Sequence, residues 1–142
     1  MTLAFDMKYT RTYDRSDIAG PAITQRPINP APLMGTWVNF NNATGGVVRL
    51  VLTEKQGTFI VQAFGACEPS PCDWGDARGE IFAAGIAHHE AVGFKAHYDF
   101  GFMETFLAAY LNKRLLVLDS YNVFKDGSGR SRYFFRDHFY QP

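Results

Sequence analysis

From Leu33 to its C-terminus, the sequence is a series of short β-type runs, each separated from the next by residues that favour turns. Residues 93–100 show this most clearly, because apolar side chains at 94, 96, 98 and 100 alternate with polar ones at 95, 97 and 99. That period of two is typical of a half-buried strand. The segments 41–46 and 125–130 are rich in Asn and Gly, which tolerate the positive φ of tight reversals. Short connections of this kind predict an antiparallel meander.

We expect about eight strands in this meander, over residues 35–40, 47–53, 58–64, 78–83, 93–100, 103–111, 115–124 and 131–140. Residues 103–111 could form a helix instead, since Ala and Leu favour one, but the neighbouring runs are strands. Eight antiparallel strands that close on themselves remove every edge and leave an interior about wide enough for one small ligand. The predicted fold class is all-β, an antiparallel up-and-down barrel of eight or so strands.

Residues 1–32 form a separate N-terminal arm ahead of the predicted barrel, which covers residues 33–142. Residues 20–32 hold four prolines, which oppose both helix interiors and central strands. Before them, apolar side chains at 3, 5, 7, 9 and 13 alternate with mostly polar ones, the pattern of a half-buried strand. The arm could add an edge strand, close one mouth of the barrel as a lid, or pair with a second subunit to make a homodimer.

The charge balance narrows the range of partners. Lysine plus arginine number 14, equal to aspartate plus glutamate, so no overall field attracts nucleic acid or an anionic membrane. No apolar run suits a signal peptide or approaches the roughly 20 residues that cross a bilayer. We therefore expect a cytoplasmic protein that binds neither nucleic acid nor membranes. In a reducing compartment Cys67 and Cys72 are expected as thiols more than as a disulfide, although the sequence leaves both open.

Aromatic residues make up 15% of the chain, with 13 Phe, 7 Tyr and 2 Trp. Wide side chains pack well on strands, and cavities use them as walls. A hydrophobic small molecule is therefore the expected partner, held in the interior of the barrel.

Gly35-Thr36-Trp37, at the head of the first predicted strand, resembles the Gly-x-Trp signature of the lipocalins and calycins. The resemblance implies a lipocalin-like barrel over about residues 33–140, with Trp37 plugging its closed end. It also implies an arginine from the last strand over the indole, for which Arg132 and Arg136 are the candidates within the strand. The stretch from Ala66 to Gly75, which contains both cysteines, is similar to a motif of uncharacterised bacterial lipocalin-like domains, a resemblance that implies no activity.

Ten residues are candidates for the site. Those expected to act in catalysis, by shaping the substrate, donating hydrogen bonds or carrying protons, are Tyr98, Tyr121, Tyr133, Glu104 and His88. Those expected to line the ligand cavity are Trp37, Phe64, Phe94, Phe106 and Phe135. The structural alternatives are that the rings simply fill the barrel and that His88 belongs to a solvated loop. No cofactor or metal is expected, because the sequence lacks nucleotide-binding and His-Glu-x-x-His motifs and the two cysteines lack further ligands.

Three functions remain open at the level of the sequence. The first is a cofactor-independent cyclase or isomerase of natural-product metabolism, in which the barrel folds a flexible unsaturated substrate. The second is a non-catalytic carrier or sensor of a hydrophobic metabolite. The third is an interaction module with a filled barrel. The absence of an export signal and the presence of the arm favour the enzyme.

Overall fold

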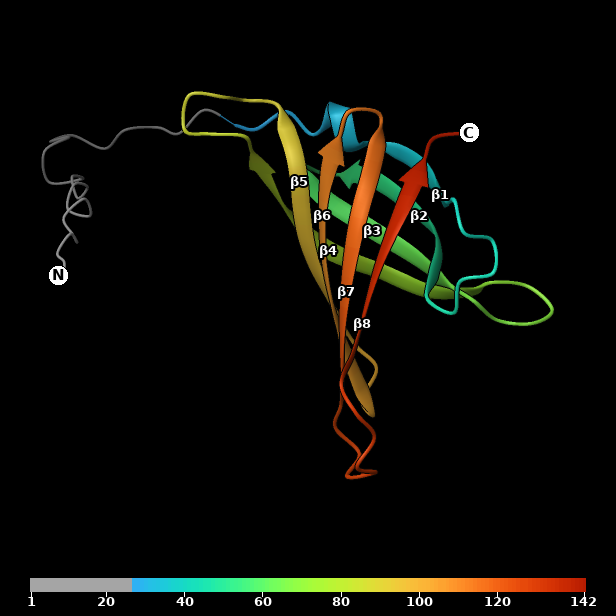
Figure 1. Ribbon diagram of the computed structural model, residues 1–142. Helices are drawn as coiled ribbons and strands as arrows, with labels where there is room; N and C mark the ends of the chain where they lie inside the picture. Colours follow the sequence, from blue (N-terminus) through green and yellow to red (C-terminus); the bar gives the residue numbers. More distant parts are fainter. Residues whose placement is uncertain (1–26) are drawn as a thin grey trace, which may run out of the picture.

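The structure is a computed structural model that describes residues 27–142. Eight antiparallel strands form one closed barrel in which each strand pairs with the next and β1 pairs with β8 (Figure 1). The strands are β1 (Gly35–Asn39), β2 (Val47–Lys55), β3 (Thr58–Gly65), β4 (Cys72–Ala83), β5 (Ala91–Asp99), β6 (Met103–Asn112), β7 (Leu115–Phe124) and β8 (Tyr133–Tyr140), preceded by a 3₁₀ turn, η3 (Ala31–Leu33). The predicted all-β barrel is confirmed, and residues 103–112 are a strand rather than a helix.

β4 is the strand whose predicted bounds differ most from the observed ones. It begins at Cys72 instead of residue 78, which shortens the preceding loop. The β3–β4 register shifts between Gln62 and Phe64, and Gly75 has a φ of 85°. This irregularity breaks the alternation of residues 72–76, so the first half of the strand has no period-2 signal in the sequence.

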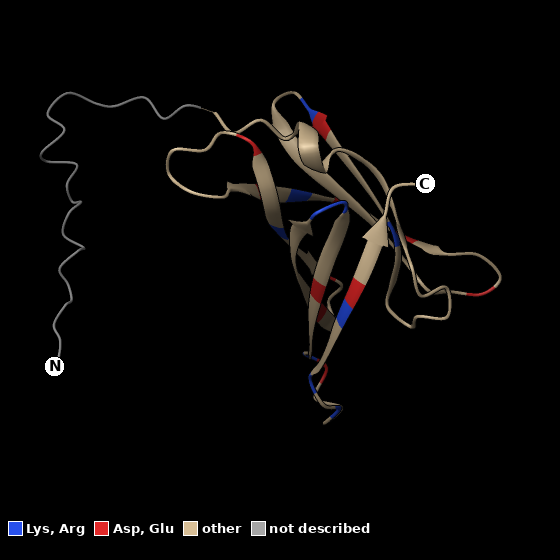
Figure 2. Cartoon of the chain, turned by 45° about the horizontal axis from the view of Figure 1, so that its top comes forward, with Lys and Arg blue, Asp and Glu red and all other residues tan. Residues whose placement is uncertain are grey.

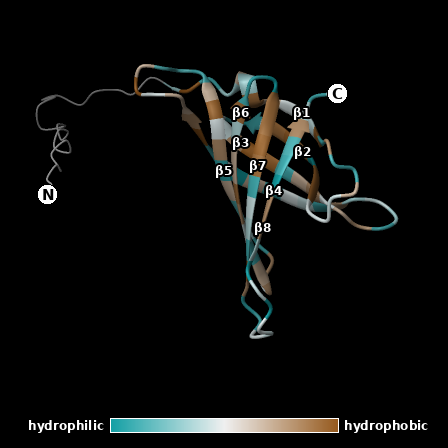
Figure 3. Cartoon of the chain, in the orientation of Figure 1, coloured by the Kyte–Doolittle hydropathy of each residue, from teal (hydrophilic) through white to brown (hydrophobic). Residues whose placement is uncertain are grey.

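Strand alternation places one set of side chains inside the barrel. Leu50, Val61, Leu107, Leu118 and Phe139, from five strands, are between 0 and 1% exposed. They belong to a single hydrophobic cluster to which every strand contributes. In Figure 3 the upper half of β7 is brown, the colour of hydrophobic residues. The core of the protein is therefore the barrel interior itself.

The two ends of the barrel differ. At one end η3 places Leu33 over the interior, where it is fully buried, and the Trp37 indole Nε1 donates to the Leu33 carbonyl oxygen (2.8 Å). Beside η3, Asn29 pairs with Glu90 in a parallel bridge. The connections 40–46, 66–71, 100–102 and 125–132 lie at the other end. Residues 27–33 thus meet the barrel at the Trp37 end, while the strand, lid and dimer roles suggested for residues 3–13 lie outside the described residues.

Among residues 27–142, no helix is long and apolar enough to cross a membrane.

Candidate functional site

Three of the predicted site residues lie deep in the interior, where they make structural contacts. Trp37 is bonded to the backbone of Leu33, and the Phe94 ring packs against Phe59 with centroids 5.6 Å apart. The Tyr98 hydroxyl accepts from the Ala63 amide (3.0 Å) and lies within donating distance of the Val61 and Gly75 carbonyl oxygens, at 3.0 and 2.7 Å.

The buried environment of Tyr98 also keeps its hydroxyl group protonated. Burial raises the pKa of Tyr98 to about 12, so the phenol stays neutral at physiological pH. Because its hydroxyl is committed to the backbone of β3 and β4, Tyr98 joins these strands together and offers no free polar group to a ligand.

Two other predicted residues lie where the interior opens toward the loops. Tyr133 is 40% exposed, and its ring stands edge-on to Phe135 at 5.6 Å. Below them the Thr105 hydroxyl donates to Asn122 Oδ1 (2.7 Å). Thr105 is fully buried and Asn122 is 4% exposed, so this hydrogen bond belongs to the core of the barrel.

The interior is filled between Leu33 and Thr105. A side chain that is 0–1% exposed borders no space large enough for a water molecule, and such side chains extend from Leu33 at one end of the barrel as far as Thr105. Packing of this density is usual for protein cores. The chamber expected for a substrate therefore has no counterpart around these side chains.

Four predicted residues lie on the outside of the barrel, contrary to the expectation that they line its interior. Phe64 faces outward from β3, with the Arg49 guanidinium 4.1 Å from its ring centroid. Phe106 and Tyr121 are 40% and 48% exposed, and Glu104 lies on the same face of β6 as Phe106. The reason is their register, since the buried neighbours on β6 and β7 take the positions that point inward.

His88 lies apart from the other nine, in the connection between β4 and β5. Its backbone amide donates to the Gly85 carbonyl oxygen (3.1 Å), and its imidazole lies against Gly85.

The outward aromatic residues form a row across four strands. The register pairs His97 of β5 with Phe106 of β6, Phe106 with Tyr121 of β7, and Tyr121 with Phe134 of β8. The imidazole of His97 stacks on Phe106 at 4.6 Å and 17°, and Tyr121 lies 5.1 Å from Phe134. We call these four residues the outer aromatic row. Rings directly opposite on neighbouring strands stabilise a sheet, but four exposed rings in line also present a surface to a partner.

A groove of about 440 Å³ runs along this row, and we call it the outer groove. Its lining comprises Arg78, Glu80, Lys95, Ala96, His97, Phe106, Leu107, Ala108 and Tyr121. Small Ala108 lies in register between Lys95 and Asp119, which leaves the depression beside the rings. The volume is within the range of sites that hold small organic molecules.

Most charges around the outer groove are paired. Lys95 bonds to Glu80 (3.2 Å), and His97 lies 3.4 Å from Glu104, which also contacts Lys125 (3.0 Å). These pairs are partly exposed, so each contributes little to stability.

Two further ionic contacts lie near the outer groove. Asp99 and Lys125 form a close pair, and the lysine ammonium lowers the pKa of the Asp99 carboxyl. Arg136 and Asp119 form a bidentate pair at 2.7 and 2.9 Å. Figure 2 shows basic and acidic segments side by side on the strands of the barrel. Arg78 differs from these cations, since no carboxylate of the described residues lies within 4 Å of it.

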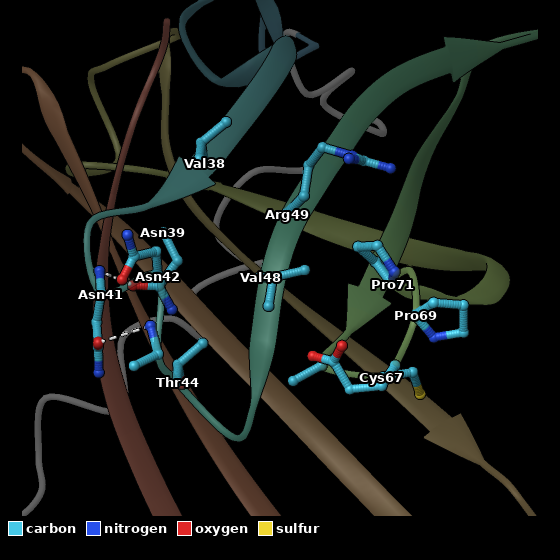
Figure 4. A pocket seen from close by; sticks show the side chains of 13 residues that line it. Val38, Asn39, Asn41, Asn42, Thr44, Val48, Arg49, Cys67, Pro69 and Pro71 are labelled. Atoms are coloured by element: carbon cyan, nitrogen blue, oxygen red, sulfur yellow. Dashed lines mark hydrogen bonds between the residues drawn. The ribbon is translucent and has the colours of Figure 1, made fainter.

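A second pocket, of about 480 Å³, lies between the β1–β2 and β3–β4 connections. Figure 4 shows Val38 and Val48 between the asparagines of one loop and the prolines of the other. Its amides serve the loop itself: Asn39 Oδ1 accepts from the Asn41 amide (2.8 Å), and Asn41 Oδ1 accepts from Ala43 (3.0 Å). With its polar groups engaged in this way, the pocket is a weaker candidate than the outer groove.

Cys67 and Cys72 border this second pocket and are joined as a disulfide, with Cα atoms 5.5 Å apart. The sequence leaves both thiols and a disulfide open for these cysteines, and the structure has the disulfide. Across residues 27–142, no three His, Cys, Asp or Glu side chains gather in a way that could hold a metal ion.

The arginine implied by the lipocalin resemblance does not pack over Trp37. Arg136 points outward to Asp119, and Arg132 precedes β8 at the opposite end of the barrel. The closed antiparallel barrel is consistent with a lipocalin-like fold. Comparison with protein-family models, curated proteins and solved structures finds no significant match to this chain.

Residues that the sequence reasoning missed complete the outer groove. His97, Arg78 and Phe134 were not among the ten candidates, although the alternation of residues 93–100 already places His97 outward. The three-residue connection after Asp99 then fixes the register that sets His97 opposite Phe106. Reading the hairpin register together with the alternation would have found this pair.

Proposed function

We propose that this protein binds a planar, unsaturated, hydrophobic small molecule in the outer groove, and that it acts as a carrier or sensor. The observation that carries the proposal is the outer aromatic row, with Phe106 and Tyr121 exposed at the wall of a groove of about 440 Å³. Flat apolar ligands stack on such rings, and burying both surfaces from water drives their binding.

The filled interior supports the outside location. A ligand inside the barrel would have to displace side chains such as Leu107 and Leu118, each of which contributes to the stability of the fold. A ligand in the outer groove displaces only water from rings that are already exposed.

A fluorescence titration with the neutral polyene 1,6-diphenyl-1,3,5-hexatriene tests the proposal. We expect saturable binding with a Kd on the order of 10⁻⁵ M. Phe106→Ala and Tyr121→Ala should each weaken binding roughly tenfold, because each removes one stacking ring. Phe40→Ala is the matched control, since Phe40 is also exposed but packs against Tyr140 on another part of the barrel.

Two results would count against an outer site. Binding that survives both groove substitutions but is lost in Phe135→Leu would place the ligand at the mouth of the interior instead. The absence of any saturable binding would remove the small-molecule function altogether and leave the filled-barrel interaction module.

A second candidate function is a cofactor-independent isomerase, favoured by the contact between His97 and Glu104 at the edge of the outer groove. Imidazole can accept a proton from an allylic carbon of a bound molecule and return it to another carbon, which moves a double bond without any cofactor. NMR of trans-4-phenylbut-2-enoate in D₂O tests this: loss of a proton from C4 and return of a deuteron to C2 would give 4-phenylbut-3-enoate with deuterium at C2 as the expected result. His97→Gln should abolish the exchange in protein that is saturated with the compound, and equal exchange in the variant would exclude the role.

The cytoplasmic location expected from the sequence is likewise a proposal. In that compartment the Cys67–Cys72 pair would be held mainly as thiols. Thiol alkylation in intact cells before lysis tests it, and a fully oxidised pair would argue for an oxidising compartment.

A further inference from the structure

We infer that the ligand of the outer groove is an anion, a planar unsaturated monocarboxylate whose acid group is bound by Arg78. The inference rests on the proposed function, because it takes the outer groove as a binding site and asks which molecule suits it. It starts from the charges of the groove rather than from its rings.

Arg78 is the cation of the groove lining that lacks a carboxylate partner among residues 27–142. Lys95 is neutralised by Glu80 at 3.2 Å. Asp76, two residues before Arg78 on the same face of β4, is engaged by Lys55 at 2.8 Å. Across the strands, Arg78 lies opposite Ile60 on β3, and the β4–β5 register continued by one residue places it opposite His97. The neighbours that could neutralise the guanidinium are therefore apolar, basic or already paired.

The spacing of the strands gives the size of the ligand. Neighbouring strands lie about 4.8 Å apart, so two spacings separate Arg78 on β4 from Phe106 on β6 by about 10 Å, and Tyr121 on β7 lies about 5 Å further. A molecule with its carboxylate at Arg78 and its planar body over Phe106 must span this distance. Guanidinium binds carboxylate through two parallel hydrogen bonds, which would fix one end of the ligand and orient the rest along the outer aromatic row.

The chemical class follows from the two ends together. The rings favour a flat conjugated body, and the Arg78 guanidinium, which has no carboxylate partner within residues 27–142, favours a single negative charge at one end. A dicarboxylate fits less well, because its second charge would lie over Phe106 and Tyr121 and would lose hydration there without a partner.

The test compares 5-phenylpenta-2,4-dienoate with its methyl ester, which has the same conjugated body but no charge. Binding of each to the full chain is followed by NMR, from the shifts of the Phe106 and Ala108 backbone amides. We expect the acid to bind about tenfold more tightly than the ester at 50 mM salt, and the difference to shrink at 500 mM.

Variants assign the charge to one residue. Arg78→Gln should weaken binding of the acid to the level of the ester and leave the ester unchanged, and Arg78→Lys should keep part of the preference. Arg132→Gln is the matched control, because it removes the same guanidinium charge from an exposed position outside the groove lining, and it should retain the preference.

The outcomes separate this inference from the function on which it rests. Equal binding of acid and ester by the wild-type protein would overturn the inference that the ligand is an anion. The groove would then remain a site for neutral molecules. A preference that persists in Arg78→Gln, or that is lost in Arg132→Gln, would overturn the role of Arg78. If the acid, its methyl ester and diphenylhexatriene all fail to bind, the proposal that the outer groove is a ligand site is wrong.

Discussion

Gly79→Ala tests whether the interior of the barrel is filled. Gly79 points inward from β4, and a Cβ at this position would lie 2.7 Å from Cδ2 of Phe59 and 3.0 Å from Cγ2 of Val61. Contacting carbon atoms are ordinarily about 3.5–4.0 Å apart, so the phenylalanine ring would have to move. The ring packs against Phe94 and is 5% exposed, which leaves it little room.

The expected magnitude is the balance of two effects. Extra carbon in a packed core costs about 1–3 kcal/mol, whereas replacing glycine by alanine at an ordinary φ stabilises by about 0.4–1 kcal/mol through the unfolded chain. The free energy of unfolding should therefore fall by about 1–2 kcal/mol. With a typical urea m-value of about 2 kcal/mol/M, the midpoint should drop by roughly 0.5–1 M.

Gly45→Ala is the matched control, because Gly45 has no positive φ and no atom lies within 4 Å of an added Cβ. It should leave the urea midpoint unchanged or raise it slightly. Adding Phe59→Leu to Gly79→Ala should recover part of the loss by making room for the methyl group. If Gly79→Ala proves as stable as the wild type, the ring has free space to enter, and the barrel interior again becomes a candidate ligand chamber.

Three further predictions concern other interior and loop contacts. The neutral phenol of Tyr98 is favoured in the folded state, whereas in the unfolded chain the same phenol ionises near pH 10. The free energy of unfolding should therefore fall as the pH rises from about 10 toward 12, and urea unfolding of Tyr98→Phe should show a flatter decline over that range. Thr105→Val leaves Asn122 Oδ1 without its 2.7 Å donor in a buried site and should cost about 1–3 kcal/mol in urea unfolding, whereas an unchanged midpoint would mean that water replaces the hydroxyl. Replacing both Cys67 and Cys72 by serine should cost about 2 kcal/mol for a loop this short, and the wild type in reductant should melt at the same temperature as the variant; a wild-type melt that is insensitive to reductant would mean that the bond is absent in solution.

The barrel could be predicted from the sequence because its signals are local. Alternation within residues 93–100 and the Asn- and Gly-rich turns fix strands and reversals without reference to distant contacts. Residues 115–124 match the observed strand at both ends. The start of β4 was missed because its bulge near Gly75 interrupts the alternation.

The position of the site could not be predicted in the same way. β6 is apolar on both faces, with Leu107 inside and Phe106 and Tyr110 outside, so hydropathy does not reveal which face points inward. The neighbouring strands determine which face of β6 points inward, because Tyr98 of β5 and Asn122 of β7 take inward positions and form buried hydrogen bonds there. These are long-range contacts, and aromatic content alone cannot show on which side of the wall the rings lie.

The outer aromatic row also bears on how the protein behaves at high concentration. The four exposed rings can pack against the same rings of a second molecule. A formal net charge of zero at pH 7 supplies no electrostatic repulsion between the two molecules. The ligand-free protein should therefore be least soluble near neutral pH. A bound carboxylate would cover the rings and add negative charge at once, so the occupied protein should stay dispersed at concentrations where the empty one precipitates.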